Sequence, residues 1–491
     1  MRKIHVLILL AIFVICIQVN SAEVRPPNII FIIADDLGYG DIGCYGQKFI
    51  KTPNIDKLAS EGIRFTQHYS GSPVCAPSRC VLLTGKHSGH AFIRDNKEAK
   101  PEGQYPIPEN TITIAKLLKK LGYATGAVGK WGLGAPDSTG SPLKQGFDYF
   151  FGYNCQRHAH NYYPTYLWEN DKKVPLDNPE IPAYQKFPSD ADPKNPKNYE
   201  KYIGKIYSPD VISEKARSFV IQNKDKPFFL YWATTVPHVA LQVPQDSLNE
   251  YLGKFDDKPY LGENGYLPHY SPRAAYAAMI TRMDNEIGKM VNLIKSLGLE
   301  ESTIFVFTSD NGPVLKVGGT DPEFFNSTGG LRGYKGSLYE GGIRVPLVVR
   351  WKNHIQSGKI SDYVCGFEDW LPTILDLCGG NAIIPKDCDG VSFAPILFGK
   401  NAPPKPFLYR EFPGYGGQQA VRMGDWKLIK TSMLRRNQKT TIELFNLKTD
   451  PYEKTNVISE HPEIVKKLEE ILVREHIPSE VFPFPPIDNK K

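Results

Sequence analysis

The feature that most constrains the fold is a short, almost unbroken apolar run at residues 28–34, NIIFIIA, rich in β-branched side chains. An apolar side chain at nearly every position, rather than at alternate ones, is typical of a strand buried on both faces. Similar runs occur at residues 124–128, 228–234 and 303–308. Strands of this kind belong to mainly parallel sheets that are covered on both sides. We therefore expect an α/β fold around such a sheet.

Helical patterns lie between these strands. Apolar residues recur with a helical period at residues 54–62, 113–122, 209–223 and 272–298. Strands that alternate with helices along the chain favour a parallel sheet with helices on both faces. In such folds the chemistry lies at the carboxyl ends of the strands.

The character of the sequence changes after about residue 380. Short strand-like segments at residues 419–423, 426–431 and 442–446 are separated by polar turns, and a helical pattern follows at residues 461–475. This order predicts a small antiparallel sheet with one helix packed on it. We therefore expect a main α/β domain, which carries the chemistry, at residues 23–380 and a C-terminal subdomain at residues 381–491.

The N-terminus has the order of a secretory signal peptide. Two basic residues, an apolar run and Asn20-Ser21-Ala22 make up residues 1–22. A lipoprotein acylated at Cys16 is a less favoured alternative, because the bulky Ile15 precedes that cysteine. No other run approaches the roughly 20 apolar residues of a membrane span. The sequence thus predicts an exported protein, periplasmic or secreted, without an integral membrane segment.

Charge argues against one class of partner. Removal of the two basic residues of the signal lowers the net charge from +6 to +4, and 469 of the 491 residues remain. The chain has no basic run interleaved with aromatic residues. The sequence therefore lacks the charge pattern of a nucleic-acid-binding protein.

Seven of the eight cysteines lie beyond the predicted signal peptide. An odd number in an exported protein suggests that one cysteine has a separate role, and Cys75 is the candidate. Cys378 and Cys388 are close enough in sequence to form a small disulfide loop, but spacing alone does not establish the pairing.

Acidic residues follow two of the predicted buried strands. Asp35 and Asp36 come directly after the first strand, and Asp310 and Asn311 follow the strand at residues 303–308. Close carboxylates repel one another unless a cation lies between them. An all-oxygen set with no paired histidines suits calcium or magnesium better than zinc, and the stricter octahedral demand of magnesium favours calcium. A helix cap or turn is the alternative for either pair alone.

The segment CAPSR at residues 75–79, with Leu83-Thr84-Gly85 after it, resembles the signature of the type I, formylglycine-dependent sulfatases. The resemblance extends over about residues 27–457, and exported bacterial carbohydrate sulfatases are the most similar group. Further motifs occur in the order that the family uses: Asp35-Asp36 before Gly38-Tyr39-Gly40-Asp41, Gly129-Lys130-Trp131, Pro237-His238, Ser309-Asp310-Asn311-Gly312, and Lys335-Gly336 with Tyr339-Glu340-Gly341-Gly342.

The resemblance implies an alkaline-phosphatase-like fold and a specific centre. A maturation enzyme would oxidise Cys75 to formylglycine, whose hydrate attacks the sulfur of a sulfate ester. One calcium ion beside the modified Cys75 would be held by Asp35, Asp36, Asp310 and Asn311. Arg79 and Lys130 would grip the nucleophile and the sulfate oxygens, while His238 would be the general acid, assisted by Lys335.

The family resemblance also implies a substrate, a sulfated carbohydrate such as galactose or N-acetylgalactosamine 4-sulfate. The candidate substrate-binding residues are His87, His90, Arg94, Arg157, His158, His160 and Glu411. Arg94 and Glu411 have an interdomain salt bridge as an equal alternative.

One position departs from the family pattern, which commonly has a histidine where this chain has Gly132. The candidate replacements are His87, His90, His158 and His160.

Two other functions remain open at this point. Related formylglycine enzymes cleave phosphate or phosphonate esters, so the signature alone does not decide between the substrates. A non-catalytic protein that binds sulfated glycans is the second alternative, and only Gly132 favours it.

Overall fold

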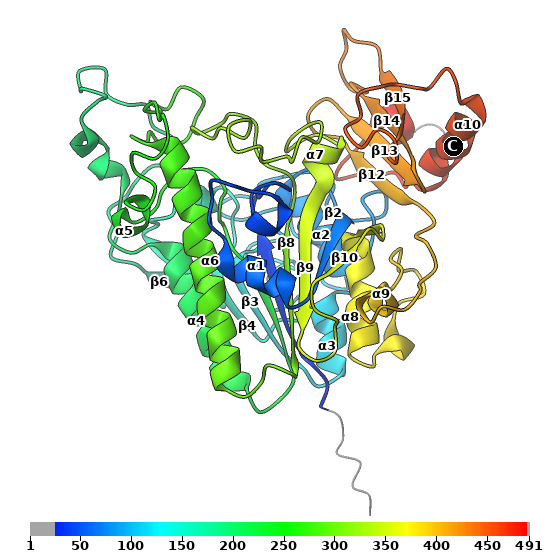
Figure 1. Ribbon diagram of the computed structural model, residues 1–491, viewed down its shortest axis with the longest axis horizontal. Helices are drawn as coiled ribbons and strands as arrows, with labels where there is room; N and C mark the ends of the chain where they lie inside the picture. The colour runs from blue at the N-terminus through cyan, green and yellow to red at the C-terminus, as the bar shows by residue number, and fades with distance from the viewer. Residues whose placement is uncertain (1–24, 489–491) are drawn as a thin grey trace, which may run out of the picture.

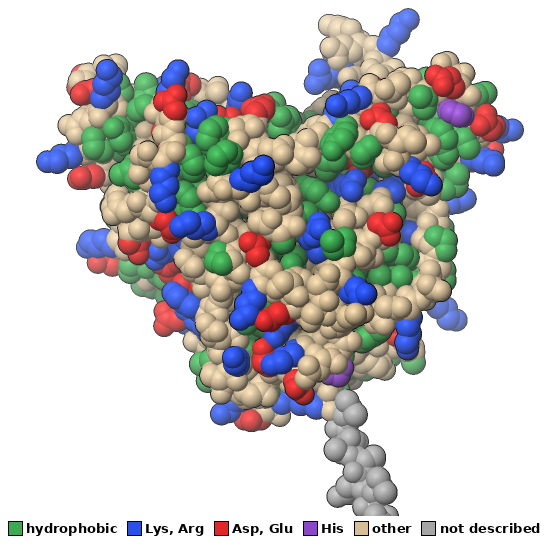
Figure 2. Space-filling view, in the orientation of Figure 1, with side chains coloured by type: hydrophobic (Ala, Val, Ile, Leu, Met, Phe, Trp, Pro, Cys, Tyr) green, Lys and Arg blue, Asp and Glu red, His purple; other side chains and the backbone are tan. Residues whose placement is uncertain are grey.

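The computed structural model describes residues 25–488, so the predicted signal peptide lies outside the described residues. A large sheet of eleven strands forms the centre of the molecule, and a four-stranded sheet lies at its upper right in Figure 1. Within residues 25–488, no helix has both the length and the apolar character of a membrane span. Acidic and basic side chains are interspersed over the face in Figure 2, in keeping with the mild net charge.

The large sheet has the strand order β10-β2-β9-β8-β1-β7-β3-β4-β5-β6, and β11 also pairs with β2. Strand β1 pairs in parallel with β7 and β8, whereas β9 runs antiparallel between β8 and β2. The predicted mainly parallel sheet is confirmed. The strands are β1 (Asn28–Ala34), β2 (Ile63–Tyr69), β3 (Ala124–Lys130), β4 (Tyr149–Tyr153), β5 (Tyr166–Glu169), β6 (Lys172–Pro175), β7 (Phe228–Ala233), β8 (Thr303–Ser309), β9 (Arg344–Trp351), β10 (Lys359–Ser361) and β11 (Cys365–Gly366).

The packing of strand β1 on both of its faces explains why its sequence is almost entirely apolar. Ile30 and Ile32 pack into a core with α1, α4 and α6, while Ile29, Phe31 and Ile33 pack into a second core with α2, α3 and α8. Each such burial contributes roughly 1.5–3 kcal/mol. The helices are α1 (Pro53–Ser60), α2 (Cys75–Thr84), α3 (Ile114–Lys120), α4 (Ser208–Asn223), α5 (Gln245–Leu248), α6 (Pro272–Ser296), α7 (Glu340–Ile343), α8 (Trp370–Leu377), α9 (Ala394–Leu397), α10 (Pro462–Arg474) and α11 (Pro485–Asp488).

The second sheet is antiparallel, with the order β12-β13-β14-β15. Its strands are β12 (Leu408–Phe412), β13 (Gln418–Met423), β14 (Trp426–Thr431) and β15 (Thr441–Asn446). Helix α10 covers one face through Leu468 and Leu472, which join the core of Tyr409, Val421 and Leu428. The predicted sheet with one packed helix is confirmed.

Some strands were not expected from the sequence. Strand β12 contains Arg410 and Glu411, both fully buried, and β9 contains Pro346 between two arginines. A buried strand that contains charged side chains does not show the continuous apolar pattern by which such strands are predicted. It can be predicted only if the partners of those charges are known. The sequence analysis missed β12 and β9 for this reason.

Candidate active site

Two neighbouring parallel strands bring acidic side chains together at their carboxyl ends. Asp35 and Asp36 follow β1, and Asp310 follows β8; the Asp36 amide donates to Asp310 Oδ1 at 3.1 Å. Consecutive side chains of an extended strand point to opposite faces. Asp36 instead has φ +64°, a left-handed conformation that costs roughly 1–3 kcal/mol outside glycine. Carboxylate oxygens of both Asp35 and Asp36 consequently lie within 4.8 Å of Cys75 Sγ.

Cys75 is the first residue of helix α2 and is only 1% exposed. Its Sγ lies 3.6 Å from Lys130 Nζ, at the helix end that favours negative charge. Burial nevertheless raises the pKa of the Cys75 thiol to about 12, although Lys130 and Lys335 oppose this. The unmodified thiol is therefore protonated at neutral pH and is a weak nucleophile.

Three cations balance the three carboxylates. Arg79 Nε and Nη2 donate to Asp310 Oδ2 at 3.1 and 2.7 Å. Lys130 Nζ lies 2.6 Å from Asp35 Oδ2, and Lys335 Nζ lies 2.7 Å from Asp36 Oδ1. We call this group the charged centre; its members are Asp35, Asp36, Asp310, Arg79, Lys130 and Lys335.

Two buried oxygens at the charged centre lack a hydrogen-bond partner among the described residues, Asp35 Oδ1 and Asn311 Oδ1. The Asn311 amide nitrogen donates to Asp36 Oδ1 at 2.7 Å, which leaves the amide oxygen free. An unsatisfied buried acceptor costs about 1–3 kcal/mol. Carboxylate and amide oxygens are ligands for a hard divalent cation such as calcium. The residues present therefore fit such an ion.

The electrostatics of the carboxylates agree with this fit. Burial raises the pKa of Asp36 against the effect of Lys335, and burial with the charge of Asp35 raises that of Asp310 to about 6. For Asp35, burial is outweighed by Lys130 and the other nearby cations, so its pKa is lowered. A cation among them would favour the ionised form of all three carboxylates.

His238 lies in the loop after β7 and faces the same group. Its Nδ1 is bonded to the Val239 carbonyl, so Nδ1 carries the proton and Nε2 is the free nitrogen, 3.4 Å from Asp36 Oδ2. Burial, Lys335 and Lys130 lower the pKa of His238 well below its usual value. His238 is therefore neutral in this arrangement.

Residues 27–380 match the family described as Sulfatase. The chain belongs to the sulfatase family. Residues 333–477 also match the C-terminal region of N-sulphoglucosamine sulphohydrolase. Because sulfatases hydrolyse sulfate esters, this protein is a sulfuric ester hydrolase.

Named relatives of this sulfatase act on carbohydrates. N-acetylgalactosamine-6-O-sulfatase of Bacteroides thetaiotaomicron is 32% identical, and the match covers 92% of this chain and 94% of the relative. Human N-acetylgalactosamine-6-sulfatase is also 32% identical, over 79% of this chain and 69% of its own. The crystal structure of Ps i-CgsB, also solved with k-i-k-neocarrahexaose, superposes with a TM-score of 0.73 and 29% identity over 92% of each chain.

The histidines predicted for substrate binding fall into separate places in this sulfatase. The His160 ring stacks on that of His238, with centroids 4.7 Å apart and planes at 10°. His158 instead packs on Tyr166 and lies 3.7 Å from Glu102 Oε1, and burial lowers its pKa to about 4. The structure thus brings His160, but not His158, beside the charged centre.

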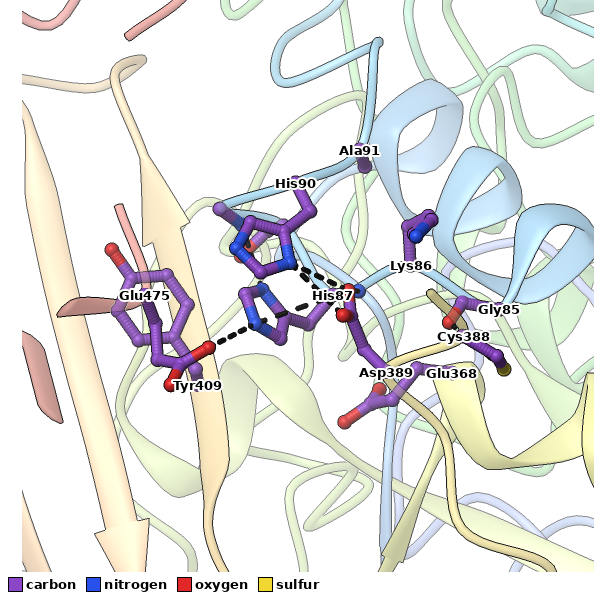
Figure 3. A network of polar contacts seen from close by, with 12 residues as sticks. Gly85, Lys86, His87, His90, Ala91, Glu368, Cys388, Asp389, Tyr409 and Glu475 are labelled. Carbon is purple, nitrogen blue, oxygen red and sulfur yellow. Dashed lines mark hydrogen bonds and ion pairs between the residues drawn. The ribbon is translucent and has the colours of Figure 1, made fainter. Parts of the chain in front are cut away.

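His87 and His90 lie in another network, which Figure 3 shows. His87 Nε2 is 3.1 Å from Glu475 Oε2, and His90 Nδ1 is 2.9 Å from Asp389 Oδ1. Both histidines follow the C-terminal end of α2, on the order of 15 Å along the helix from Cys75. The structure does not bring them to the charged centre.

Arg94, in the loop after α2, forms a buried ion pair with Glu411 of strand β12. Arg94 Nη1 lies 2.7 Å from Glu411 Oε1 and also donates to the Ile477 carbonyl. Glu411 further accepts from Tyr409 and contacts His476. This is the geometry of the interdomain salt bridge, the alternative that the sequence analysis left open.

Arg157 lies near the surface, with its guanidinium 5.6 Å from the ring centroid of Tyr184 and 3.8 Å from Glu98.

The sequence analysis missed Tyr184 and Tyr266, whose rings continue outward from His160. It also missed Gln418, which bonds the backbone of Gly336 and Leu338 beside Lys335. No local motif marks these residues, because their positions depend on segments distant in sequence.

Gly132 adopts a conformation that explains the missing family histidine. Its φ is +87°, and a Cβ atom there would lie 2.7 Å from Gln156 Nε2. A histidine at this position would require a strained backbone and movement of Gln156.

Proposed function

We propose that this sulfatase removes sulfate from a galactose or N-acetylgalactosamine residue of a sulfated carbohydrate. The single observation that carries this proposal is the placement of Cys75 beside a charge-balanced centre in which two buried oxygens lack a hydrogen-bond donor among the described residues. Conversion of Cys75 to formylglycine by a maturation enzyme, export from the cytoplasm and one bound calcium ion are parts of the proposal.

Asp35, Asp36, Asp310 and Asn311 would hold the calcium ion. Once present, calcium would neutralise charge on the sulfate, and formylglycine hydrate would supply the oxygen that attacks sulfur. The three carboxylates and three cations cancel, so a divalent ion leaves the site positive and favours an anionic ester. Arg79 and Lys130 orient the sulfate oxygens through charge-assisted hydrogen bonds.

Proton transfer falls to Lys335 and His238. The oxygen of a departing sugar is a poor leaving group without a proton, and the Lys335 ammonium is a proton donor at this position. Burial disfavours its charge, but Asp36 and the other nearby anionic groups outweigh burial and raise the pKa of Lys335 well above its ordinary value, which keeps it protonated. The free Nε2 of His238 is set to accept a proton when sulfate is released. In this proposal Lys335 is the main acid, which differs from the resemblance, where His238 was the general acid and Lys335 assisted it. His238 instead takes the task of the family histidine that is replaced by Gly132 in this chain, a task for which the sequence analysis had named other histidines.

The relatives favour position 6 of the sugar over the position 4 that the sequence analysis named. Two of them are N-acetylgalactosamine-6-sulfatases. The structural neighbour Ps i-CgsB has been solved with k-i-k-neocarrahexaose. We therefore place 6-sulfated N-acetylgalactosamine first and galactose sulfates second.

The test measures sulfate release from 6-sulfated and 4-sulfated N-acetylgalactosamine, galactose sulfate, an aryl sulfate and a matched phosphate ester. We expect the 6-sulfated sugar to be hydrolysed fastest and the phosphate ester to be almost inert. Faster cleavage of the phosphate ester would favour the phosphohydrolase alternative. Binding of the sulfated sugars without turnover would favour the glycan-binding alternative.

The modification is tested on the same active preparation by mass spectrometry of the peptide that contains Cys75. A mass that shows replacement of the thiol by an aldehyde is expected. An unmodified thiol in protein with full activity would contradict the formylglycine part of the proposal.

A further inference from the structure

A series of aromatic rings leads outward from His238. The His160 ring stacks on His238, and the Tyr266 ring lies 5.2 Å from His160 and 6.1 Å from His238. Tyr184 follows, 5.1 Å from Tyr266, with its hydroxyl 2.6 Å from His160 Nδ1. We call His160, Tyr266 and Tyr184 the aromatic rim.

The aromatic rim connects the buried centre to solvent. The His238 side chain is 4% exposed, His160 and Tyr266 are half-buried, and Tyr184 is 44% exposed. A large ring left so exposed beside a buried reaction centre is available to a ligand that extends beyond the centre.

Tyr266 has a backbone conformation that is unusual for a bulky residue. Its φ is +64°, in the left-handed region that costs a non-glycine residue free energy, and the preceding Gly265 has φ +81°. This turn directs the Tyr266 ring inward. Burial is the main cause of the raised pKa of its hydroxyl, and the charges of Lys335 and Asp36 also act on it. Observed strain of this kind is concentrated at functional sites.

The chemistry of the aromatic rim suits a sugar ring. The C–H face of a pyranose packs on the face of an aromatic side chain, and sites for such ligands combine aromatic walls with a few polar groups. Arg157 adds a cation, 5.6 Å from the centroid of Tyr184 and 62% exposed. An anionic substituent on the same sugar could pair with this guanidinium.

We propose that Tyr184, Tyr266 and Arg157 bind the sugar residue next to the sulfated one, so that the preferred substrate is an anionic oligosaccharide. This inference rests on the proposed function, which places the sulfated ring at the charged centre. The aromatic rim then supplies binding energy remote from the reacting sulfur and selects for chain length.

The test compares Tyr184→Ala with the wild type on a 6-sulfated tetrasaccharide and on a small aryl sulfate. We expect KM for the tetrasaccharide to rise about 3- to 10-fold, and KM for the aryl sulfate to rise by a clearly smaller factor. Tyr184→Phe keeps the ring but loses the hydroxyl bond to His160, and its KM for the tetrasaccharide should stay well below that of Tyr184→Ala. Tyr452→Ala, at an equally exposed tyrosine (42%) elsewhere, is the matched control.

Several results would overturn the inference. An equal loss on both substrates would show that Tyr184 acts by positioning His160 and His238. A Tyr184→Phe variant as impaired as Tyr184→Ala would show that the hydroxyl, not the ring face, matters. A wild-type enzyme with equal kcat/KM on the sulfated monosaccharide and the tetrasaccharide would have no such subsite.

Failure of the proposed function has a different signature. If the wild type hydrolyses no sulfated sugar, calorimetric binding of the same tetrasaccharide still tests the aromatic rim. Weaker binding by Tyr184→Ala of at least threefold would support the subsite, and equal binding by the two proteins would overturn it.

Discussion

Two clusters of buried charge in this sulfatase have similar composition but opposite organisation. One is the charged centre at the ends of β1 and β8. The other, which we call the sheet junction, joins the C-terminal sheet to the main sheet, and its members are Glu368, Asp369, Lys405 and Arg410. Both are almost inaccessible to solvent, and in both the positive and negative groups are equal in number.

Every carboxylate oxygen of the sheet junction has a partner. Arg410 binds Glu368 through two nitrogens, at 3.2 and 2.8 Å, and donates to the Ser70 carbonyl. Asp369 accepts from Lys405 and from two backbone amides. A buried ionic group that is paired in this way holds elements in register.

At the charged centre, by contrast, Asp35 Oδ1 and Asn311 Oδ1 have no hydrogen-bond donor among the described residues, and Arg79 Nη2 lies 3.7 Å from Asp35 Oδ1, beyond hydrogen-bond distance. Leaving these acceptors unpaired lowers stability, and a ligand would restore it. The difference shows how to distinguish a structural charge cluster from a binding centre. Buried oxygens without a hydrogen-bond donor indicate a binding centre, whereas a balance of positive and negative groups occurs in both kinds of cluster.

The largest effect should follow from Cys75→Ala. We expect kcat to fall by about 10⁴-fold or more, because the proposed nucleophile is lost, while the urea unfolding midpoint changes little. Cys80→Ala, at another buried cysteine of α2, should keep its activity. Substantial turnover by Cys75→Ala would require another nucleophile.

Arg410→Met should have the largest effect on stability. It leaves Glu368 and two carbonyls without this donor, and loss of one partner of a buried pair costs about 3–5 kcal/mol. Urea unfolding measures this loss, with the exposed Lys467→Met as control. A loss below about 1 kcal/mol would contradict the structural role of the sheet junction.

Calcium should act on the charged centre alone. After treatment with a chelator, calcium at 100 times its Kd should stabilise the wild type by about 2.7 kcal/mol. Arg410→Met should keep this increment, and Asp36→Asn should lose it. Thermal unfolding with and without calcium gives the comparison, and an undiminished increment in Asp36→Asn would place the ion elsewhere.

The two clusters should also respond differently to pH. The raised pKa of Asp310, about 6 when folded against an ordinary 3.8, means that its contribution to stability is present below pH 3.8 and is lost as pH rises through 6. Asp310 should thus contribute on the order of 1 kcal/mol to the stability that chelated wild type gains between pH 7 and 5, and Asp310→Asn should reduce the gain by this amount.

Glu368 gives the control for this experiment. Burial would raise its pKa, but Arg410 and Lys405 outweigh that effect and lower it. Its contribution is present above its ordinary pKa of 4.5 and is lost only at more acid pH. Glu368→Gln should therefore keep the gain between pH 7 and 5 in urea unfolding, and loss of the gain would show that Asp310 is not its source.

The smallest effect should come from His90→Ala. Because His90 contacts Asp389 and not the charged centre, kcat/KM for the sulfated sugar should change less than about twofold. His160→Ala, which removes the ring stacked on His238, should reduce it more. The reverse order would assign His90 to substrate binding after all.

The sequence predicted those parts of the fold whose physical cause is local. Strand β1 is buried on both faces, and this accounts for its apolar run. The acidic residues after β1 and β8 lie together because these neighbouring strands are parallel and end at the same edge of the sheet. Strand β12 escaped prediction because Arg410 and Glu411 are buried only through partners such as Glu368 and Arg94, far away in sequence.

The candidate site was predictable to a similar extent. Cys75, Lys130, His238 and Lys335 were identified by resemblance, and the structure brings them together. His87 lies near the signature in sequence. In the structure, however, it follows the C-terminal end of helix α2, whereas Cys75 lies at the N-terminal end. Tyr266 depends on the conformation of a remote loop, which has no signature in a single sequence.

The charged centre joins residues that are very distant along the chain. The contact between Asp36 and Lys335 spans 299 positions, and helix α2, strand β3 and the end of strand β8 contribute the intervening members. Contacts between residues so distant in sequence carry a cost in loop-closure entropy and slow folding. A polypeptide that stops short of Lys335 therefore has no complete charged centre, and occupancy of the site is a readout of whether β1, β3, β8, helix α2 and the Lys335 loop have assembled.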